Sequence, residues 1–313
     1  MAEKLADKVW IDGELVNWED ATIHVISHVV HYGSSVFEGI RCYDVGGTPK
    51  IFHLHAHVDR LFDSAKIYRM EIPFSKDEIK QAMLDTIKAN GFQECYVRPV
   101  FFRDQGALGV NPFPAEVKCV ILTWKWGAYL GKEALEEGVD ICVSTWSRMH
   151  ANTHAGIAKA GGNYLNSQLM KMEALTNGYV EAIALQTNGY IAEGSGENLF
   201  MIAKRWGDKH STIFTPPLSA SILSGITRAT VIQLASELGM TVVEQTLPRE
   251  ALYVCDELFF TGTAAEITPI RTVDRLPIGT GRRGPVTKQL QEALFAILTG
   301  KVEDRHGWLT PVE

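Results

Sequence analysis

The sequence predicts an α/β protein, close to the α+β type, in which mixed and mostly antiparallel sheets carry helices on their outer faces. Three observations favour this fold class. Tight hairpin turns outnumber strand–helix–strand units, the helices have recognisable start and stop signals, and the strands are rich in aromatic and β-branched residues. The chain has 313 residues, which is enough for a sizeable core and for two domains.

The first elements follow from local turn and capping chemistry. Residues 9–16, VWIDGELV, predict a hairpin because Asp12-Gly13 suits a type I′ turn. Residues 75–91 predict a helix that opens with a capping box of Ser75 and Glu78. Two segments rich in aromatic and β-branched residues then predict strands, at 94–102 and 117–124.

The pattern changes after residue 126. We predict a smaller N-terminal α/β domain at residues 1–126, an interdomain loop at 127–136 and a larger C-terminal domain at 137–313. The elements predicted for the C-terminal domain are strands at 139–146 and 256–262, a hairpin at 182–194 with an Asn188-Gly189 turn, and helices at 163–178, 225–239 and 285–300.

The composition predicts a globular protein of the cytoplasm. The net charge of −7, with mixed signs, argues against binding to nucleic acid or to an anionic membrane. No apolar run approaches the roughly 18 residues of a spanning helix, and the N-terminus lacks the pattern of a signal peptide. The five scattered cysteines favour reduced, mostly buried thiols over a disulfide framework or a zinc site.

Two motifs admit alternative interpretations. Residues 279–284, GTGRRG, match the G-x-G-x-x-G pattern of dinucleotide-binding loops, but no convincing strand precedes them, so we favour a loop before a helix. His53, His55 and His57 alternate along the chain, and on a strand they would share one face and could bind a metal ion. Because a fourth ligand is lacking, we interpret them as polar surface histidines and predict no metal site.

Two segments are suited to hold an anion. Gly225-Ile226-Thr227 open a predicted helix, where backbone N–H groups are unpaired and the helix dipole is positive. Gly262-Thr263-Ala264 follow a predicted strand and offer N–H groups and a hydroxyl. The alternative for each is ordinary turn and capping chemistry.

Lys159 lies among small residues in the segment GIAKAGGNYL, residues 156–165. A lysine whose pKa is lowered can form a Schiff base, and small neighbours let a flat ligand lie against the backbone. The alternative is a flexible surface loop. Glu193 lies in IAEGSGENLF, where a carboxylate among apolar and small residues is either paired, functional or solvated at the end of a strand.

Taken together, these groups are the ones that pyridoxal 5′-phosphate requires. Lys159 offers an amine for its aldehyde, the two anion-binding segments suit its phosphate, and Glu193 offers a carboxylate that keeps its ring nitrogen protonated. Tyr164 lies close by in the sequence.

With these residues identified, the sequence resembles the branched-chain amino acid aminotransferases, which are pyridoxal-phosphate-dependent enzymes of fold-type IV and class IV. The resemblance extends from about residue 9 to residue 309, nearly the whole chain. The segments that carry it are FEGIR (37–41), DRLFDSAKIYRM (59–70), YVRP (96–99), ALGVNP (107–112), WGAYLG (126–131), AKAGGNYLNS (158–167), GYIAEGSGENLF (189–200), SGITR (224–228) and GTAAEITPIR (262–271). It implies a two-domain fold whose larger domain contains a pseudo-barrel, with the cofactor between the domains.

The resemblance implies a role at the cofactor for several residues. Lys159 would form the Schiff base and move the proton between the substrate Cα and the cofactor C4′. Glu193 would pair with the pyridine nitrogen, Tyr164 with the phenolic oxygen, and Leu223 would pack against the ring. The residues that would bind the phosphate are Arg60, Ile226, Thr227 and Thr263.

It also implies a set of substrate-binding residues. Tyr96 and Arg98 are two apart and so share one face of a strand. Tyr96 resembles a ligand of the α-carboxylate, assisted by the N–H groups of Thr263 and Ala264, and Arg98 resembles the receptor of the glutamate side chain. An apolar pocket would comprise Tyr32, Phe37, Val110 and Tyr129, with Tyr32 and Val110 reaching across a dimer interface; Arg41 belongs to the same motif without an assigned role.

The implied activity is ping-pong transamination of L-leucine, L-isoleucine or L-valine with 2-oxoglutarate, in branched-chain amino acid biosynthesis, by a homodimer or a higher homo-oligomer. Three alternatives stay open. One is an aminotransferase of the same fold type that prefers D-amino acids or (R)-amines, against which YVRP and ALGVNP speak. The others are a Schiff-base aldolase without a cofactor, whose purified protein would be colourless, and a non-catalytic carrier of pyridoxal phosphate.

Overall fold

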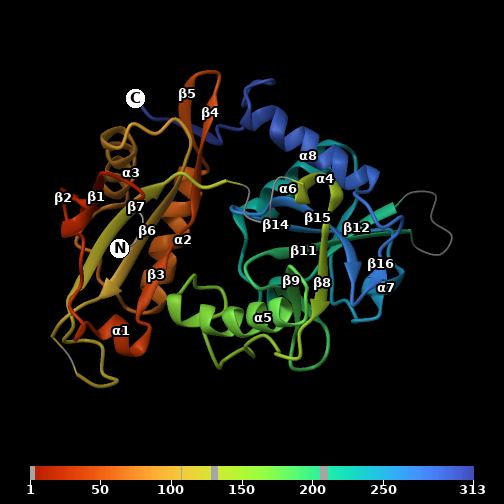
Figure 1. The fold of residues 1–313 in the computed structure, drawn as a ribbon, viewed down its shortest axis with the longest axis horizontal. Coiled ribbons are helices and arrows are strands. Elements are labelled where there is room, and N and C mark those ends of the chain that lie inside the picture. The colour runs from red at the N-terminus through yellow and green to blue at the C-terminus, as the bar shows by residue number, and fades with distance from the viewer. Residues whose placement is uncertain (1–3, 107, 128–132, 205–210) are drawn as a thin grey trace. The chain divides into compact units, whose positions relative to one another are not determined.

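The chain forms two compact units in the computed structural model, which describes residues 4–106, 108–127, 133–204 and 211–313. Unit 1 comprises Met1–Trp126, Ala158–Gly162 and Ile297–Glu313, and unit 2 comprises Gly127–Ile157 and Asn163–Ala296 (Figure 1). The short segment that carries Lys159 therefore belongs to unit 1. The domain boundaries inferred from the sequence remain a prediction, and part of the predicted interdomain loop lies outside the described residues.

Unit 1 is built on a sheet that, within the described residues, has eight strands in the order β17-β5-β4-β6-β7-β1-β2, with β3 paired to β6. Every pairing is antiparallel. The strands are β1 (Lys8–Ile11), β2 (Glu14–Asn17), β3 (Ser35–Phe37), β4 (Ile40–Val45), β5 (Thr48–Phe52), β6 (Cys95–Arg103), β7 (Val117–Trp124) and β17 (Leu309–Pro311). The predicted strands at 94–102 and 117–124 are confirmed as β6 and β7.

The N-terminal hairpin forms as predicted, with β1 and β2 joined by Asp12 and Gly13. Both turn residues have a positive φ, 47° and 102°, as a type I′ turn requires. This turn matches the right-handed twist of the two strands, so the local sequence is sufficient to set the register.

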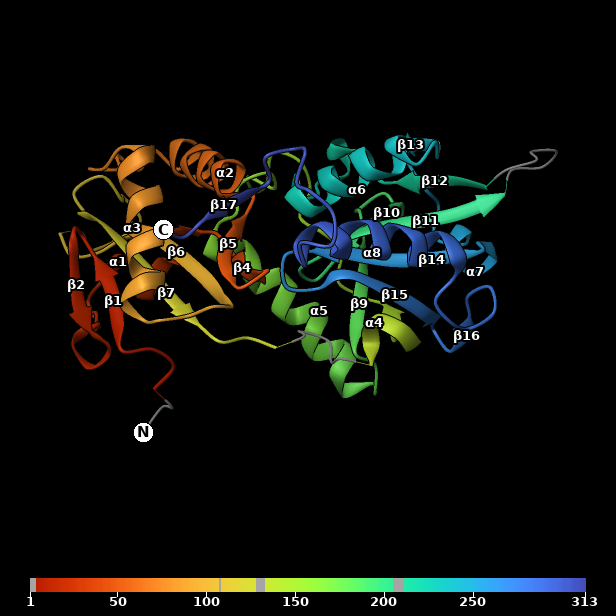
Figure 2. The same cartoon turned by 90° about the horizontal axis from the view of Figure 1, so that it is seen from above.

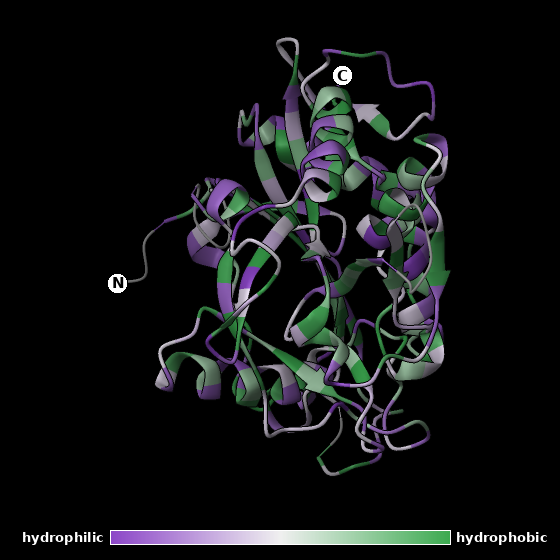
Figure 3. Ribbon diagram, turned by 90° about the vertical axis from the view of Figure 1, so that its right-hand side faces the viewer, coloured by the Kyte–Doolittle hydropathy of each residue, from purple (hydrophilic) through white to green (hydrophobic). Residues whose placement is uncertain are grey.

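Helices pack against the sheet of unit 1 and complete its core. They are α1 (His28–Tyr32), α2 (Leu54–Ile67) and α3 (Lys76–Ala89), with a short 3-10 turn η1 (Trp18–Asp20). α3 contacts β1, β6 and β7, and α2 contacts α3 and β3 (Figure 2). Hydrophilic and hydrophobic residues are interspersed along the helices (Figure 3), and the buried residues of α2 and α3 recur every three to four positions, which gives each of these two helices an apolar face. The buried residues that these two faces contribute to the core are Leu54, Val58, Leu61, Ala65, Ile79, Ala82, Met83 and Ile87.

The prediction for the three alternating histidines is wrong in one respect. Residues 54–67 form helix α2, so His53, His55 and His57 do not share the face of a strand. His57 is 1% exposed and therefore is not a surface residue, whereas His55 is exposed. The prediction of surface histidines failed for His57 because its buried partner, Glu38, is 19 residues away in the chain.

Unit 2 is built on a second sheet, which in the described part of the chain has nine strands in the order β10-β9-β8-β15-β14-β11-β12-β13, with β16 paired to β15. The strands are β8 (Val139–Val143), β9 (Glu181–Leu185), β10 (Ile191–Gly194), β11 (Asn198–Lys204), β12 (Ser211–Thr215), β13 (Val242–Glu244), β14 (Glu257–Gly262), β15 (Glu266–Val273) and β16 (Leu276–Pro277). The mixed, mostly antiparallel character expected from the sequence is confirmed, since only β8–β9, β8–β15 and β12–β13 pair in parallel among the described strands.

The sheet of unit 2 is curled. Strands β10 and β11 are separated by β9, β8, β15 and β14 in the sheet order, yet only Ser195, Gly196 and Glu197 connect them in the chain. The N–H of Gly194 donates to the carbonyl of Glu197 at 2.8 Å, which closes this turn. Such a short connection is possible only if the sheet bends until its first strand approaches its sixth, and this bend is the predicted pseudo-barrel.

The helices of unit 2 begin and end close to the predicted positions. They are α4 (Ala134–Glu137), α5 (Tyr164–Thr176), α6 (Ile226–Glu237), α7 (Ala251–Val254) and α8 (Pro285–Leu298), with the 3-10 turn η3 (Leu218–Ala220); the 3-10 turn η2 (Gly161–Asn163) begins in the last residues of the Lys159 segment of unit 1. The predicted helices at 163–178, 225–239 and 285–300 are confirmed as α5, α6 and α8. Residues 279–284 form a loop before α8, as predicted.

The five cysteines are buried and free, in agreement with the prediction of reduced thiols. Within the described ranges, none of the helices combines the length and the hydropathy that crossing a bilayer requires.

The capping box of α3 gives a direct test of the local sequence rules. The Ser75 hydroxyl accepts from the N–H of Glu78 at 3.2 Å, and the Glu78 carboxylate accepts from the N–H of Ser75 at 2.7 Å. We expect Ser75→Ala to lower the free energy of unfolding by about 1 kcal/mol, because the N–H of Glu78 loses the hydroxyl that accepts its bond, while the main-chain N–H of residue 75 still donates to Glu78. Urea denaturation measures the change. Ser75→Asp, which keeps an acceptor, should stay close to the wild type; equal losses in the two variants would contradict the capping role.

Candidate active site

The main chain of Lys159 is fixed in unit 1 by strand β3. The N–H of Phe37 donates to the carbonyl of Lys159 at 3.0 Å, and Val36 and Ala160 form an isolated antiparallel bridge. Gly161 packs so closely on Ser35 that a Cβ at this glycine would overlap the serine hydroxyl. Part of the reason for the small residues after Lys159 is therefore this backbone contact.

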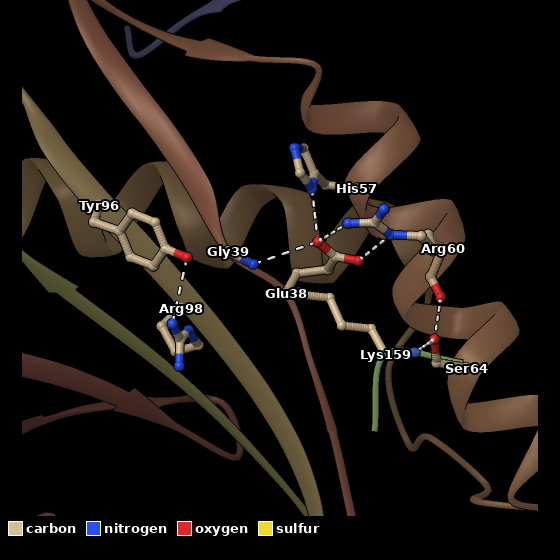
Figure 4. A network of polar contacts seen from close by, with 8 residues as sticks. All are labelled: Glu38, Gly39, His57, Arg60, Ser64, Tyr96, Arg98 and Lys159. Carbon is tan, nitrogen blue, oxygen red and sulfur yellow. Dashed lines mark hydrogen bonds and ion pairs between the residues drawn. The ribbon is translucent and has the colours of Figure 1, made fainter. Parts of the chain in front are cut away.

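A buried carboxylate, Glu38, lies directly after Phe37 and is 0% exposed. It accepts hydrogen bonds from His57 Nδ1 at 2.7 Å, from Arg60 Nε and Nη2 at 2.6 and 2.8 Å, and from the N–H of Gly39 at 3.3 Å (Figure 4). Burial opposes ionisation of this group, but the charge of Arg60 and the bond from His57 hold the pKa of Glu38 far below its usual range. Glu38 is thus an anion inside the core, and it orients the guanidinium of Arg60.

The charge of His57 follows from the same contacts. Burial lowers the pKa of His57, although Glu38 acts in the opposite direction. His57 is therefore a neutral imidazole that donates through Nδ1, and Arg60 supplies the positive charge that balances Glu38.

Arg98 is enclosed by aromatic rings. Its guanidinium carbon lies 4.8 Å from the ring centre of Phe37, 5.2 Å from that of Tyr96 and 5.6 Å from that of Trp124. These distances are typical of cation–π contacts. Arg98 Nη2 also donates to the Tyr96 hydroxyl at 3.3 Å, and, among the described residues, its buried Nε has no hydrogen-bond partner. The side chain is held in one place with donor capacity left for an anion.

Phe37 brings Arg98 and Lys159 together. The Nζ of Lys159 lies 4.8 Å from the centre of the same ring that faces Arg98. Tyr96 belongs to this group because its hydroxyl occupies the space where a Cβ of Gly39 would lie. Gly39 thus gives the phenol room to reach Arg98.

Apart from Phe37, Tyr96 and Arg98, the predicted substrate residues of unit 1 are Arg41, which lies on the sheet, and Tyr32 and Val110, which are exposed. Arg41 is the cross-strand partner of Tyr96 and so shares its face of the sheet. Tyr32 and Val110 are 48% and 83% exposed. They are linked through His28, whose ring lies 4.6 Å from that of Tyr32 and whose Nε2 lies 3.1 Å from the carbonyl of Gly109. Tyr129 lies outside the described residues.

Unit 2 contains a second buried carboxylate, Glu193, which is 4% exposed. It forms an ion pair with Arg148 at 2.5 Å and accepts from Asn198 Nδ2 and from the N–H of Leu223, both at 3.0 Å. The predicted cofactor residues Glu193 and Leu223 are therefore in contact. The amide of Asn198 also donates to the carbonyl of Leu223 at 2.9 Å, which fixes the loop before α6 to the start of β11.

Helix α6 begins next to this cluster. Its N-cap is Gly225, which supplies no side-chain acceptor to the N–H groups of Ile226 and Thr227. A Cβ at Gly225 would overlap the amide oxygen of Asn198, so only glycine allows this close approach. Thr263 and Ala264 lie in the tight turn between β14 and β15, and Tyr164 is the first residue of α5.

A third carboxylate, Glu197, is buried in the turn after Glu193. It accepts from the N–H of Gly196 at 3.0 Å, and the burial of this group, reinforced by the negative charge of Glu181, raises the pKa of Glu197 to about 8. Glu181 has a balancing cation, Lys171, at 2.8 Å. Glu197 is therefore protonated at neutral pH, which leaves Glu193 as the anion beside Leu223.

Sequence analysis did not identify Glu38, Ser64, Arg148 or Asn198. Two of them gave a usable signal, since a polar side chain among apolar residues and glycines needs a partner once it is buried. Glu38 lies in FEGIR and Asn198 in GYIAEGSGENLF, two segments that carried the family resemblance. The side chains that bind Glu38 are 19 and 22 residues away, and Leu223, one partner of Asn198, is 25 residues away, so the sequence alone could not name these partners.

The raised pKa of Glu197 predicts a dependence of stability on pH. The folded chain keeps a proton on this group up to about pH 8, whereas an unfolded chain releases it near the ordinary value for glutamate of about 4.3. Between these values unfolding releases a proton, so this group makes stability fall as the pH rises. We expect Glu197→Gln to lose less stability than the wild type between about pH 5 and pH 8.

Chemical denaturation at several pH values tests this expectation. Glu292→Gln, which removes an exposed carboxylate, serves as the control and should follow the wild type. Parallel curves for Glu197→Gln and the wild type would show that Glu197 ionises normally.

A family model described as amino-transferase class IV matches residues 35–273 of the chain. The branched-chain-amino-acid aminotransferase of Salmonella typhimurium is 52% identical over 313 residues, which cover 100% of this chain and 99% of that protein.

Solved structures agree with this match. The crystal structure of the Escherichia coli branched-chain amino acid aminotransferase has a TM-score of 0.95 and 51% identity, and the match covers 98% of this chain and 100% of that one. The Thermobaculum terrenum branched-chain amino acid aminotransferase, in its PLP-form, has a TM-score of 0.89 and 33% identity, with 99% and 100% covered. Structures of a further branched-chain amino acid aminotransferase contain pyridoxamine 5′-phosphate, N-(5′-phosphopyridoxyl)-L-glutamate or 4-methylvaleric acid. On these grounds the chain belongs to the branched-chain amino acid aminotransferases of the class IV aminotransferase family.

Proposed function

We propose that this chain catalyses the transamination of branched-chain L-amino acids with 2-oxoglutarate and uses pyridoxal 5′-phosphate as its cofactor. The observation that carries the proposal is the arrangement around Phe37 in a chain of this family. One aromatic ring faces both the Nζ of Lys159 and the guanidinium of Arg98, each 4.8 Å from its centre. An amine and an anion receptor on one ring are what an enzyme needs to process an amino acid with a second carboxylate.

The residues of the chain fit the cofactor chemically. Glu193 is a buried anion that suits a protonated ring nitrogen, and it is already bonded to the N–H of Leu223. The first N–H groups of α6, with the positive end of the helix dipole behind them, suit a phosphate. The proposed phosphate ligands are Arg60, Ile226, Thr227 and Thr263, with Tyr164 proposed at the phenolic oxygen and Leu223 against the ring.

Pyridoxal phosphate supplies an aldehyde that condenses with amines and a ring that accepts the electron pair released at the substrate Cα. The chain supplies the remaining chemistry. Lys159 Nζ is proposed to bond to the cofactor between turnovers and to move the proton from the substrate Cα during them. The hydrogen bond between its main chain and Phe37 fixes the backbone from which this amine extends.

Substrate selection is proposed to depend on the aromatic enclosure of Arg98. The rings of Phe37, Tyr96 and Trp124 give an apolar wall suited to a leucine side chain, and Arg98 suits the side-chain carboxylate of glutamate. Tyr96, with the N–H groups of Thr263 and Ala264, is proposed to bind the α-carboxylate. Arg41 and Tyr129 are further proposed members of the substrate site.

The partner of the chain is proposed to be a second copy of itself. Large apolar side chains are exposed on the two segments that His28 links, and a patch of this kind marks an interaction surface. The exposed residues are Val25, Val30, Tyr32, Leu108, Val110 and Phe113. In this arrangement Tyr32 and Val110 would contribute to the substrate site of the other copy. The cytoplasm is the proposed location, because all five cysteines are free and buried.

The first test is a spectroscopic titration of the purified protein with pyridoxal phosphate. We expect L-leucine to bleach the visible absorbance of the bound cofactor and 2-oxoglutarate to restore it. Lys159→Ala should lower turnover by at least about a hundredfold, because the proton carrier at Cα is lost. Bleaching by a D-amino acid or an (R)-amine alone would move the substrate assignment to the alternative class, and near-normal turnover of Lys159→Ala would overturn the mechanism.

The proposed role of Arg98 can be separated from that of the apolar wall. We expect Arg98→Gln to raise KM for 2-oxoglutarate by about ten- to a hundredfold, because a charge-assisted hydrogen bond is lost, and to leave KM for L-leucine close to the wild-type value. Steady-state kinetics with each substrate varied in turn measures both. Lys125→Gln removes an exposed charge one residue after Trp124 and serves as the control. Equal changes for both substrates would contradict the assignment.

A further inference from the structure

Ser64 connects two residues to which the proposed function gives chemical roles. It lies on α2 one turn after Arg60, and its hydroxyl donates to the carbonyl of Arg60 at 2.8 Å. The same oxygen accepts from the main-chain N–H of Lys159 at 3.0 Å (Figure 4). Ser64 is 1% exposed, so these bonds form away from solvent.

The geometry of the hydroxyl makes this contact directional. A serine hydroxyl has one proton, and here the proton is directed at the carbonyl four residues earlier in the helix. A lone pair of the Ser64 oxygen is then directed at Lys159. The orientation of α2 therefore determines where the main-chain N–H of Lys159 must lie to donate to it. Because the carbonyl of Lys159 is bonded to the N–H of Phe37, the residue is held on both sides.

Arg60, the second residue that Ser64 contacts, is also held in a fixed position. Glu38 binds the guanidinium of Arg60 through two bonds and follows Phe37 directly in the chain. Arg60, Ser64, Lys159, Phe37 and Glu38 thus form a closed set of contacts within unit 1. Helix α2 and the end of β3 each contribute residues to this set. The main chain of Lys159 is bonded to both, through its N–H to Ser64 and through its carbonyl to Phe37.

We infer that Ser64 is a positioning residue: its hydroxyl holds the main chain of Lys159 at a fixed place relative to Arg60. The inference rests on the proposed roles of Lys159 and Arg60. The lysine needs such support because its side chain is long and flexible, so errors in the main-chain position add to those of the amine. Misplacement of a reacting group by about 1 Å can cost about a hundredfold in rate.

Ser64→Ala tests the inference, and Thr86→Val is its matched control. Thr86 on α3 is also a buried helix residue whose hydroxyl donates to the carbonyl four residues earlier, that of Ala82 at 2.6 Å, but it lies outside the set around Lys159. Both variants lose the bond from a hydroxyl to the carbonyl four residues earlier in a helix of unit 1, and only Ser64→Ala also loses the bond from the N–H of Lys159. If the effect came only from the loss of a buried hydroxyl, kcat would fall to a similar degree in both variants.

Two measurements are made on each variant. The first is hydrogen exchange of the Lys159 amide in the chain without cofactor, which Ser64→Ala should accelerate by about tenfold. The second is steady-state kinetics with pyridoxal phosphate bound, where kcat should fall about ten- to a hundredfold with KM for L-leucine unchanged. Thr86→Val should match the wild type in both.

The outcomes separate the inference from the proposed function. Faster exchange in Ser64→Ala with an unchanged kcat would overturn the positioning role, and so would exchange equal to that of the wild type. A loss of kcat of the same size in Thr86→Val would overturn it as well. If the wild type shows amide protection but neither binds pyridoxal phosphate nor turns over L-leucine, the proposed function itself fails.

Discussion

The site of unit 1 depends on one constraint, the burial of an ionised carboxylate at Glu38. A charge inside a core is tolerated only when hydrogen bonds and an opposite charge replace water, and here His57, Arg60 and the N–H of Gly39 do so. These contacts fix the chain on both sides of Glu38. Phe37 is held where it meets Lys159 and Arg98, and Gly39 where it gives room to the Tyr96 hydroxyl.

Unit 2 also contains a buried carboxylate that is stabilised by an opposite charge and hydrogen bonds, and this one holds the loop before α6. Glu193 is buried with Arg148 as its counter-charge, and Asn198 joins it to the loop that leads into α6. The neighbouring Glu197 stays neutral because burial and the charge of Glu181 raise its pKa. Two carboxylates four residues apart, one at the end of β10 and one in the turn that follows, therefore differ in charge, and the difference comes from their partners and not from their type.

Elements with local signals could be predicted from the sequence. The Asp12-Gly13 hairpin, the capped helix α3 and the helix that begins after Gly225 depend on neighbouring residues alone. Helix α2 was obscured because three alternating histidines imitate a strand. The roles of Glu38 and Ser64 were out of reach for another reason: their partners are 22 and 95 residues away, and only the folded chain brings them together.

The contact between Gly39 and Tyr96 restricts how the sequence of this site can diverge. A Cβ at position 39 would overlap the phenol hydroxyl, so a substitution there requires the Tyr96 side chain to move or to be replaced by a smaller residue. Because the Tyr96 hydroxyl accepts a bond from Arg98, such a pair of changes also alters the arginine. Positions 39, 96 and 98 are therefore coupled, and substitutions at them should have non-additive effects on the site.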